Sequence, residues 1–342
     1  SALTTTPRRP SRASRCARST ASWLLPLAVG PAMSATGLFS GDFEVLIARL
    51  IADMDGVETR LDAALRACAD AGMPVAMAGM LDFCSDVLQI SLPNGERARL
   101  TGILTEHFGE CDLLVADHEI EVPRLFVSDM DSTMIGQECI DELADFAGIK
   151  DKVADITERA MRGELEFESA LKERVGLLEG LEEGAIATCL DQRIQPVPGA
   201  RALVNTLRSK GCRTVLVTGG FHHFADPVAE QLGFERVVGN RLGVAGGALT
   251  GLLAGPVSDA STKLATLEDE RSQLGEGARV LATGDGANDI PMIEAADYGI
   301  AYRAKPKARE AANGRIASVE LTAILKLLGI AESEWVEDFD PA

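Results

Sequence analysis

The sequence predicts an α/β protein with a doubly wound, mostly parallel Rossmann-like sheet, an inserted helical cap and a smaller α+β domain in front. Three observations predict this. From about residue 122 onward, short apolar runs typical of buried strands alternate with segments of helical periodicity. Residues 138–195 interrupt the alternation with a helical block that is too long for an ordinary crossover. Before residue 122 the pattern has the order βαββαβ, a ferredoxin-like arrangement.

Composition limits the class of protein and its partners. The 342 residues are 46% hydrophobic and 25% charged, as in soluble globular proteins, and provide for two or three domains. A formal net charge of −19 repels phosphate backbones and anionic lipid, so we expect neither a nucleic-acid nor a membrane partner. No apolar segment reaches the ~18 residues that a membrane span needs. The seven cysteines are scattered without a Cys-x-x-Cys pair, which argues against structural zinc and favours a reducing, cytoplasmic compartment.

The first part of the chain divides into two segments. Residues 1–41 contain five arginines and no acid, and residues 1–32 are rich in Arg, Ser, Thr and Pro. We interpret them as a disordered extension, with a leader segment or a stretch upstream of a true start at Met33 as alternatives. Residues 42–121 form the small α+β domain. Its expected elements are an apolar run at 43–51, helices at 57–71 and 97–108, and strands at 73–80, 83–92 and 111–116.

The remainder is expected to form the larger domain. Its core comprises residues 122–137 and 196–330, the cap residues 138–195, and a tail residues 331–342. The expected strands lie at 125–127, 213–217, 279–282 and 298–301, and the helices at 200–210, 224–232, 263–274, 291–296 and 320–328. The glycine-rich segment 237–255 predicts a hairpin or a pair of short strands.

Asp129 and Asp131 follow the first strand of this domain. Side chains on extended backbone repeat every two residues, so both carboxylates should point the same way. A hard cation with an incoming electrophile would stabilise them, one carboxylate acting as nucleophile and the other moving a proton. A calcium-binding EF-hand loop is excluded because its required Gly and Glu positions are Met134 and Ile140. A solvated turn remains the alternative.

Two further strands end in polar residues. Thr218, Gly219 and Gly220 follow one strand, and glycines there let backbone N–H groups approach an anion. The segment from Gly284 to Asp289 follows another and adds two carboxylates. Each could be an ordinary turn, but ligands of open α/β sheets bind beyond the carboxyl ends of the strands, where all three would converge.

This convergence predicts transfer of an anionic group. Carboxylates are ligands that Mg²⁺ prefers, and a fixed cation should face the transferred group. We expect Asp129, Asp131 and Asp285 to hold Mg²⁺. Lys263 is the candidate cation, its alternative being a solvated helix lysine.

The motifs resemble a known family. Asp-Met-Asp-Ser-Thr at Asp129, Val-Thr-Gly-Gly-Phe at Val217, Lys263, and Gly-Asp-Gly-Ala-Asn-Asp at Gly284 look like the four motifs of the haloacid dehalogenase superfamily. Together with Glu138, the segment 161–167, Arg174 and the segment 240–256, they resemble its phosphoserine phosphatase family. The resemblance covers residues 122–328. The domain at 42–121 resembles the ACT-like amino-terminal domain of longer bacterial members.

The resemblance implies a role for each residue of the core motifs. Asp129 would attack phosphorus and form an aspartyl-phosphate, while Asp131 would protonate the leaving oxygen and then activate water. Asp129, Asp131 and Asp285 would hold the metal, with Asp289 supporting that shell or Lys263. The phosphate oxygens would be held by Thr218, Gly219, Lys263 and Asn288. Thr218 stands where many members of the family have Ser, which keeps the hydroxyl and adds a methyl.

The resemblance also assigns roles in the cap. Glu138 would meet a substrate ammonium, Arg174 its carboxylate, and Phe167 would close the site against water. The first two make physical sense for a zwitterion, although each could be a solvated helix residue.

The function expected from the resemblance is Mg²⁺-dependent hydrolysis of O-phospho-L-serine to serine and phosphate, as in serine biosynthesis. One alternative is a superfamily phosphatase or phosphotransferase acting on another small phosphomonoester. A second is a non-catalytic amino-acid sensor. The small domain could bind an amino acid or pair subunits, so a homodimer is possible.

Overall fold

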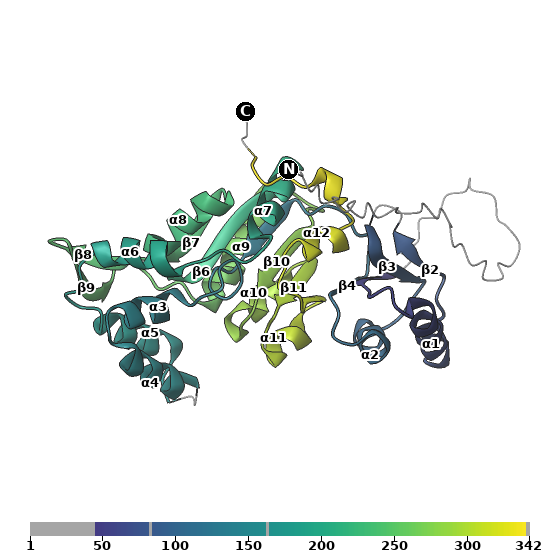
Figure 1. Ribbon diagram of the computed structural model, residues 1–342, viewed down its shortest axis with the longest axis horizontal. Helices are drawn as coiled ribbons and strands as arrows, with labels where there is room; N and C mark the ends of the chain where they lie inside the picture. The colour runs from purple at the N-terminus through teal and green to yellow at the C-terminus, as the bar shows by residue number, and fades with distance from the viewer. Residues whose placement is uncertain (1–44, 82–83, 162–163, 340–342) are drawn as a thin grey trace, which may run out of the picture. The chain divides into compact units, whose positions relative to one another are not determined.

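The structure is a computed structural model that describes residues 45–81, 84–161 and 164–339 (Figure 1). The expectations for residues 1–41 lie outside these ranges. The strands form a ten-stranded sheet in the order β2-β3-β1-β4-β12-β11-β10-β5-β6-β7, and a separate two-stranded sheet, β8-β9.

The first part of the chain has the element order βαββαβ that the sequence predicts. The elements are β1 (Leu46–Ile51), α1 (Val57–Asp70), β2 (Met77–Leu81), β3 (Cys84–Leu92), α2 (Arg97–Phe108) and β4 (Leu113–Ala116). All strand pairs within β2-β3-β1-β4 are antiparallel. Alternate residues of β1, such as Ala48 and Leu50, pack with Leu100 and Leu104 of α2 in one apolar cluster. The ACT-like assignment of this part stays a prediction.

The second part contributes a parallel sheet, as expected for an α/β fold. Its strands are β5 (Leu125–Ser128), β6 (Arg213–Phe221), β7 (Arg236–Asn240), β10 (Val280–Gly284), β11 (Tyr298–Tyr302) and β12 (Gly314–Ile316). Leu125 and Val127 of β5 pack in one apolar cluster, whereas Phe126 packs in another. Strands buried on both faces read as continuous apolar runs, which explains the Leu-Phe-Val pattern. The sheet continues into the first part because β12 pairs antiparallel with β4.

Helices cover both faces of the parallel sheet. They are α7 (Ala200–Ser209), α8 (His222–Leu232), α9 (Ala260–Leu274), α10 (Ile290–Ala295), α11 (Pro306–Ala311) and α12 (Ala323–Leu327), with short 3₁₀ turns at Ala287–Asp289 and Glu332–Glu334. Leu267 of α9 and Met292 of α10 share a cluster with Val127. Leu203 of α7 and Phe224 of α8 share the other with Phe126. This two-sided covering confirms the doubly wound prediction.

Four helices occupy the segment predicted as a cap. They are α3 (Cys139–Phe146), α4 (Lys150–Met161), α5 (Phe167–Gly176) and α6 (Gly184–Arg193). In Figure 1 they lie beside the hairpin of β8 (Leu242–Ala245) and β9 (Ala248–Leu253), and α5 contacts β9. The hairpin expected within 237–255 is therefore confirmed at 242–253, but not for residues 237–240. The first half, β7, joins the main sheet parallel to β6.

The strand order places a switch point between β5 and β10. From β5 the chain adds β6 and β7 on one side, then returns to add β10, β11 and β12 on the other. Ligands of doubly wound sheets bind outside the carboxyl ends of the strands at such a point. A ligand site is therefore expected at the residues after β5 and β10. Within the described residues, no helix is long and apolar enough to cross a membrane.

Candidate active site

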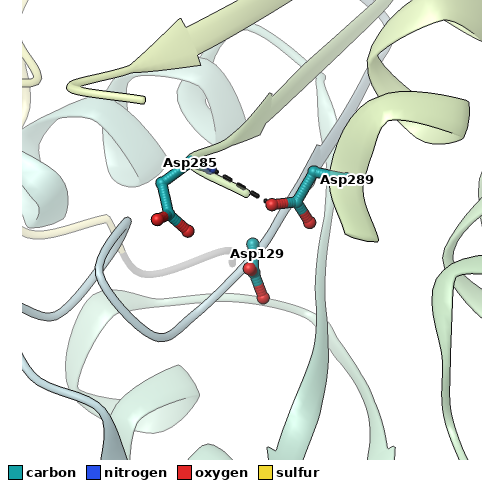
Figure 2. A group of neighbouring side chains, drawn as sticks. All are labelled: Asp129, Asp285 and Asp289. Carbon is teal, nitrogen blue, oxygen red and sulfur yellow. Dashed lines mark hydrogen bonds between the residues drawn. The ribbon is translucent and has the colours of Figure 1, made fainter. Parts of the chain in front are cut away.

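Three carboxylates converge at the switch point (Figure 2). Asp129 follows β5, and Asp285 and Asp289 follow β10; one carboxylate oxygen from each lies within 4.8 Å of the others. Backbone donors fix Asp289, because the N–H groups of Asp285 and Gly286 donate to its Oδ2 at 3.1 and 2.9 Å. Hard divalent cations such as Mg²⁺ prefer oxygen ligands of this kind. The three side chains therefore fit a metal site by number, charge and donor type.

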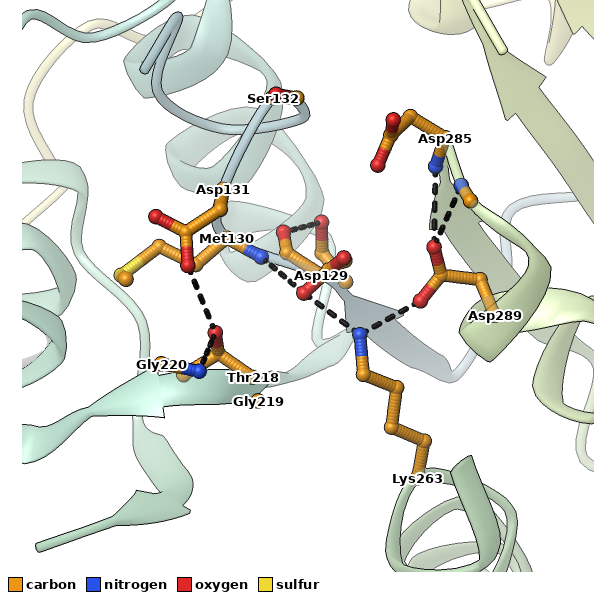
Figure 3. A network of polar contacts seen from close by, with 12 residues as sticks. Asp129, Met130, Asp131, Ser132, Thr218, Gly219, Gly220, Lys263, Asp285 and Asp289 are labelled. Carbon is orange, nitrogen blue, oxygen red and sulfur yellow. Dashed lines mark hydrogen bonds and ion pairs between the residues drawn. The ribbon is translucent and has the colours of Figure 1, made fainter. Parts of the chain in front are cut away.

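Lys263 forms ion pairs with two of these carboxylates (Figure 3). Its Nζ lies 2.7 Å from Oδ1 of Asp129 and 2.6 Å from Oδ1 of Asp289. The lysine side chain is 1% exposed, and those of Asp129 and Asp289 are 6% and 0% exposed. The lysine is held in the first turn of α9, a helix whose N-cap, Asp259, accepts the N–H of Thr262 in a capping box. A buried ammonium here offsets part of the negative charge of the acidic group.

Asp131 points away from the three clustered carboxylates. Its Oδ1 accepts the backbone N–H of Cys139 at 2.9 Å, and its Oδ2 accepts the hydroxyl of Thr218 at 3.4 Å (Figure 3). The acidic group defined by proximity therefore contains Asp289 rather than the side chain of Asp131. The assignment of Asp131 as a metal ligand and of Asp289 as a supporting residue stays a prediction.

The site raises the pKa of its carboxyl groups. Burial, partly offset by Lys263, raises the pKa of Asp129 well above its ordinary value. Burial, followed by repulsion from Glu138, raises the pKa of Asp131 to about 6. Burial, followed by repulsion from Asp289, raises that of Asp285 to about 6. Several carboxyl groups that resist ionisation in one cavity mark a place where a cation or a proton-transfer step would be favoured.

Local backbone irregularities shape two parts of the site, the Thr-Gly-Gly segment of β6 and the loop after β5. The pairing of β6 with β7 shifts register between Val217 and Phe221, which frees the intervening Thr-Gly-Gly from regular pairing. Gly220 donates its N–H to the Thr218 hydroxyl at 2.8 Å. Ser132 has φ 55°, a left-handed conformation that is uncommon for a residue other than glycine. Its hydroxyl donates to Glu138 at 2.8 Å, which ties the loop after β5 to the start of α3.

A cavity of about 670 Å³ opens above these groups. Nine of the eleven residues predicted from the sequence line it: Asp129, Asp131, Glu138, Phe167, Arg174, Thr218, Gly219, Asp285 and Asn288. The other two, Lys263 and Asp289, lie buried beneath the lining and contact Asp129 or the loop after β10. The cap residues come from the loop before α3 and from α5. The structure thus brings residues from five separated segments into one site.

The charged cap residues lie on the same cavity as the acidic group. Arg174 is half-buried, burial lowers its pKa, and Glu138 and Asp141 oppose that shift. Its Nε donates to the carbonyl of Ala170 at 3.4 Å, a weak bond that leaves its other donors for a ligand. Phe167 is 43% exposed and faces the cavity, which is unusual for an aromatic side chain.

Two contributors were missed from the sequence. Lys305 lines the cavity, its charge opposes the rise in the pKa of Asp285, and its N–H donates to the Asp285 carbonyl at 3.0 Å. Asn240, at the end of β7, donates to the Gly219 carbonyl at 2.7 Å and accepts the N–H of Ser258 at 2.8 Å. No local pattern distinguishes Lys305 from a surface lysine. Asn240 is buried at a strand end, which only the sheet register reveals.

Comparisons with known proteins identify relatives of this chain. A family model described as haloacid dehalogenase-like hydrolase matches residues 126–294. Phosphoserine phosphatase SerB2 of Mycobacterium tuberculosis is 40% identical over 252 residues, which is 72% of this chain and 61% of that protein. Phosphoserine phosphatase of Streptococcus thermophilus is 43% identical over 209 residues, 61% of this chain and 97% of that protein. The chain therefore spans about three fifths of the longer relative and nearly all of the shorter one.

A solved structure adds to these relatives. It is described as a phospho-aspartyl intermediate analogue of phosphoserine phosphatase, and it superposes with a TM-score of 0.55 at 37% identity. The match covers 60% of this chain and 99% of that one. Identity at this level over nearly whole relatives exceeds a likeness of fold alone. The chain belongs to the phosphoserine phosphatase family of the haloacid dehalogenase-like hydrolases.

Proposed function

We propose that this chain hydrolyses O-phospho-L-serine to serine and inorganic phosphate, as a step of serine biosynthesis in the cytoplasm. One observation carries the proposal: a single cavity is lined at one end by Asp129, Thr218 and Gly219, and elsewhere by Glu138 and Arg174. A phosphomonoester of an amino acid has a phosphate, an ammonium and a carboxylate. The cavity offers a group of matching chemistry for each of the three.

The proposed reaction begins at Asp129. A carboxylate oxygen attacks phosphorus, the bond from phosphorus to the serine oxygen breaks, and an aspartyl-phosphate forms. Met130 donates its backbone N–H to Oδ1 of Asp129 at 2.8 Å, which together with Lys263 fixes the carboxylate. Fixing the nucleophile before the reaction lowers the entropic part of the barrier. The solved phospho-aspartyl analogue of a family member supports this intermediate.

Asp131 is the proposed proton donor and acceptor. It gives a proton to the departing serine oxygen and then takes one from the water that attacks the aspartyl-phosphate, which returns Asp131 to its protonated form and Asp129 to a carboxylate. Its contacts with the Cys139 N–H and the Thr218 hydroxyl hold it on the cavity wall beside Asp129. The second step releases inorganic phosphate, so the atoms and charges of the hydrolysis balance.

Mg²⁺ is the proposed cofactor. The clustered oxygens of Asp129, Asp285 and Asp289 support its binding, with Asp131 the further ligand predicted from the sequence. When bound, the ion would draw negative charge from the transferred phosphoryl group. Thr218, Gly219 and Asn288 are the proposed partners of the phosphate oxygens, and Lys263 neutralises the nucleophile from below.

The alternatives make different use of the same features. A phosphatase for another small phosphomonoester would share the residues after β5 and β10 and at the end of β6, and it would have no use for Glu138 and Arg174 if its substrate lacked an amino-acid group. A non-catalytic sensor would have no use for the buried Lys263 between two carboxylates, and this arrangement disfavours it. The ACT-like part, residues 42–121, is proposed to pair subunits into a homodimer or to bind an amino acid.

A substrate panel tests the proposal. Phosphate release is measured from O-phospho-L-serine, O-phospho-D-serine, phosphohomoserine, phosphoethanolamine and sugar phosphates, each with Mg²⁺ and with a chelator. The proposal expects O-phospho-L-serine to give the highest kcat/KM and Mg²⁺ to be required. Preference for a substrate without an amino-acid group would favour the first alternative, a phosphatase for another small phosphomonoester. Absence of turnover with every substrate would support the sensor.

A further inference from the structure

A second cavity lies at the carboxyl ends of β11 and β12, next along the sheet from the proposed active site. It measures about 220 Å³ and is lined by Arg303, Arg309 and Arg315, together with Ala301, Ala304, Ile316 and Ala317. None of the three arginines lines the active-site cavity. Three guanidinium side chains around one small cavity are unexpected in a chain with 52 acidic and 33 basic residues.

Within the described ranges, the acids around this cavity neutralise only part of the positive charge. Arg309 forms an ion pair with Glu110. Arg315 donates to the carbonyls of Cys111 and Gly109 at 3.1 and 3.3 Å, which satisfies hydrogen bonds without supplying a negative charge. No carboxylate in that part of the chain forms an ion pair with Arg303 or Arg315.

One further carboxylate faces the region. Asp112 is 7% exposed, and its Oδ1 accepts the backbone N–H groups of Ala317 and Ser318 at 2.8 and 3.0 Å. Asp112 does not line the cavity and already has two donors, so among the described residues Glu110 is the acid that forms an ion pair with one of the three arginines. Guanidinium groups with an excess of positive charge match the oxygens of a phosphate or sulfate in geometry and charge.

The backbone of Arg303 is fixed at the edge of this cavity. It directly follows β11 with φ 42°, and its N–H donates to the Ile316 carbonyl at 2.8 Å, which joins the ends of β11 and β12. A left-handed conformation is strained for a residue other than glycine and persists only when its surroundings hold it. The bond to β12 is such a constraint, and it keeps Arg303 and Arg315 on the same cavity.

We propose that this arginine-lined cavity is a binding site for a small inorganic dianion of the phosphate class. Its volume admits one tetrahedral oxyanion with a few waters, each of which takes about 30 Å³ in the liquid. The site is independent of the proposed catalytic reaction. It is also close to that reaction in sequence, because Lys305 of the active-site cavity lies two residues beyond Arg303.

Hydrogen exchange of the full chain tests the proposal, with inorganic phosphate and inorganic sulfate as probes and sodium chloride at equal ionic strength as the reference. Both probes are expected to slow exchange in peptides that contain residues 315–317, which do not line the active-site cavity. Arg303→Gln should weaken this protection at least about fivefold in apparent affinity, since a charge-assisted contact is lost. Arg97→Gln, an exposed arginine on α2, is the matched control and should leave it unchanged.

The outcomes are distinct from those at the active site. Protection confined to residues 126–138 and 216–221 would mean that the anions bind only the proposed catalytic cavity, and the inference would be wrong. Equal protection in Arg303→Gln and in the unaltered chain would also overturn it. Equal protection by chloride would reduce the effect to ionic screening and would overturn it as well. Thermal unfolding of Arg303→Gln without added anion shows whether the variant keeps its fold.

Discussion

The ammonium group of Lys263 lies 2.7 Å from Oδ1 of Asp129, and both side chains are almost fully buried. The same nitrogen lies 2.6 Å from Asp289. A buried lysine shared by two carboxylates connects the stability of the fold to the reactivity of the proposed nucleophile.

Lys263→Met should destabilise the fold. Removing one partner of a buried ion pair leaves the other charges uncompensated, which costs about 3–5 kcal/mol. We expect urea unfolding to report a loss of that order in the free energy of unfolding. Lys172→Met is the control, because Lys172 is 60% exposed in its pair with Glu168 and such pairs contribute about 0–1 kcal/mol. Equal losses in the two variants would contradict the structural role of Lys263.

Asp129→Asn should abolish phosphate release and leave the chain folded. An amide oxygen cannot replace the carboxylate as nucleophile, so kcat should fall by at least about 10³-fold. Phosphate release from O-phospho-L-serine measures the loss, and circular dichroism checks the fold. Asp151→Asn, an exposed residue of α4, should retain the original rate. Near-normal turnover by Asp129→Asn would exclude Asp129 as nucleophile.

Gly220→Ala should displace the proposed proton donor. A Cβ at this position would meet Oδ2 of Asp131 at 2.7 Å and the Thr218 hydroxyl oxygen at 3.1 Å. Misplacing a catalytic group by about 1 Å can cost 10²-fold in rate, so we expect kcat to fall by about 10- to 100-fold with a smaller change in KM. Gly102→Ala, whose Cβ would meet nothing within 4 Å, provides the control. An unchanged kcat would show that Asp131 tolerates the added methyl group.

Arg174→Ala should lower kcat/KM for a substrate that has a carboxylate and spare a substrate that lacks one. A charge-assisted hydrogen bond contributes about 1.5–3 kcal/mol, so kcat/KM for O-phospho-L-serine should fall by about 10- to 150-fold. Phosphoethanolamine has the ammonium and phosphate without the carboxylate, and its kcat/KM should hardly change. If both substrates lose activity equally, Arg174 supports the cap rather than the carboxylate.

The stability of the metal-free chain should depend on pH in a definite direction. Burial raises the pKa of Asp131 and of Asp285 from 3.8 to about 6. The folded chain therefore binds more protons than the unfolded chain between these values, so the stability from both groups is lost as pH rises through about 6. Urea unfolding across this range, with a chelator, should show that decrease.

Mg²⁺ should reduce the loss of folding stability with rising pH, because a bound cation favours the ionised carboxylates. Asp285→Asn should remove much of the difference between the Mg²⁺ and chelator curves, whereas Asp151→Asn should preserve it. Curves that fall equally with and without Mg²⁺ would argue against a metal at the acidic group.

The sequence alone was sufficient for the α/β class with its mostly parallel sheet and for the strand ends that line the cavity. Apolar runs such as Leu125 to Val127 are buried on both faces of a parallel sheet, so their pattern is local and strong. The polar residues after β5 and β10 and at the end of β6 were recognisable because they follow such runs. The bounds of the strands shifted by only a few residues, as at β6, which extends to Phe221 through its irregular pairing with β7.

Only the tertiary structure decided how these segments combine. Strand β12 has three residues and α11 six, too few for a periodic pattern, so neither was expected. Whether Arg236–Asn240 forms a hairpin or joins the main sheet depends on its pairing with β6, a long-range contact. Likewise, the grouping of Asp289 with Asp129 and Asp285, the entry of Lys305 into the cavity, and the meeting of Arg303 with Arg315 arise from neighbouring strand ends. Such proximities depend on sheet order and leave no mark on local periodicity.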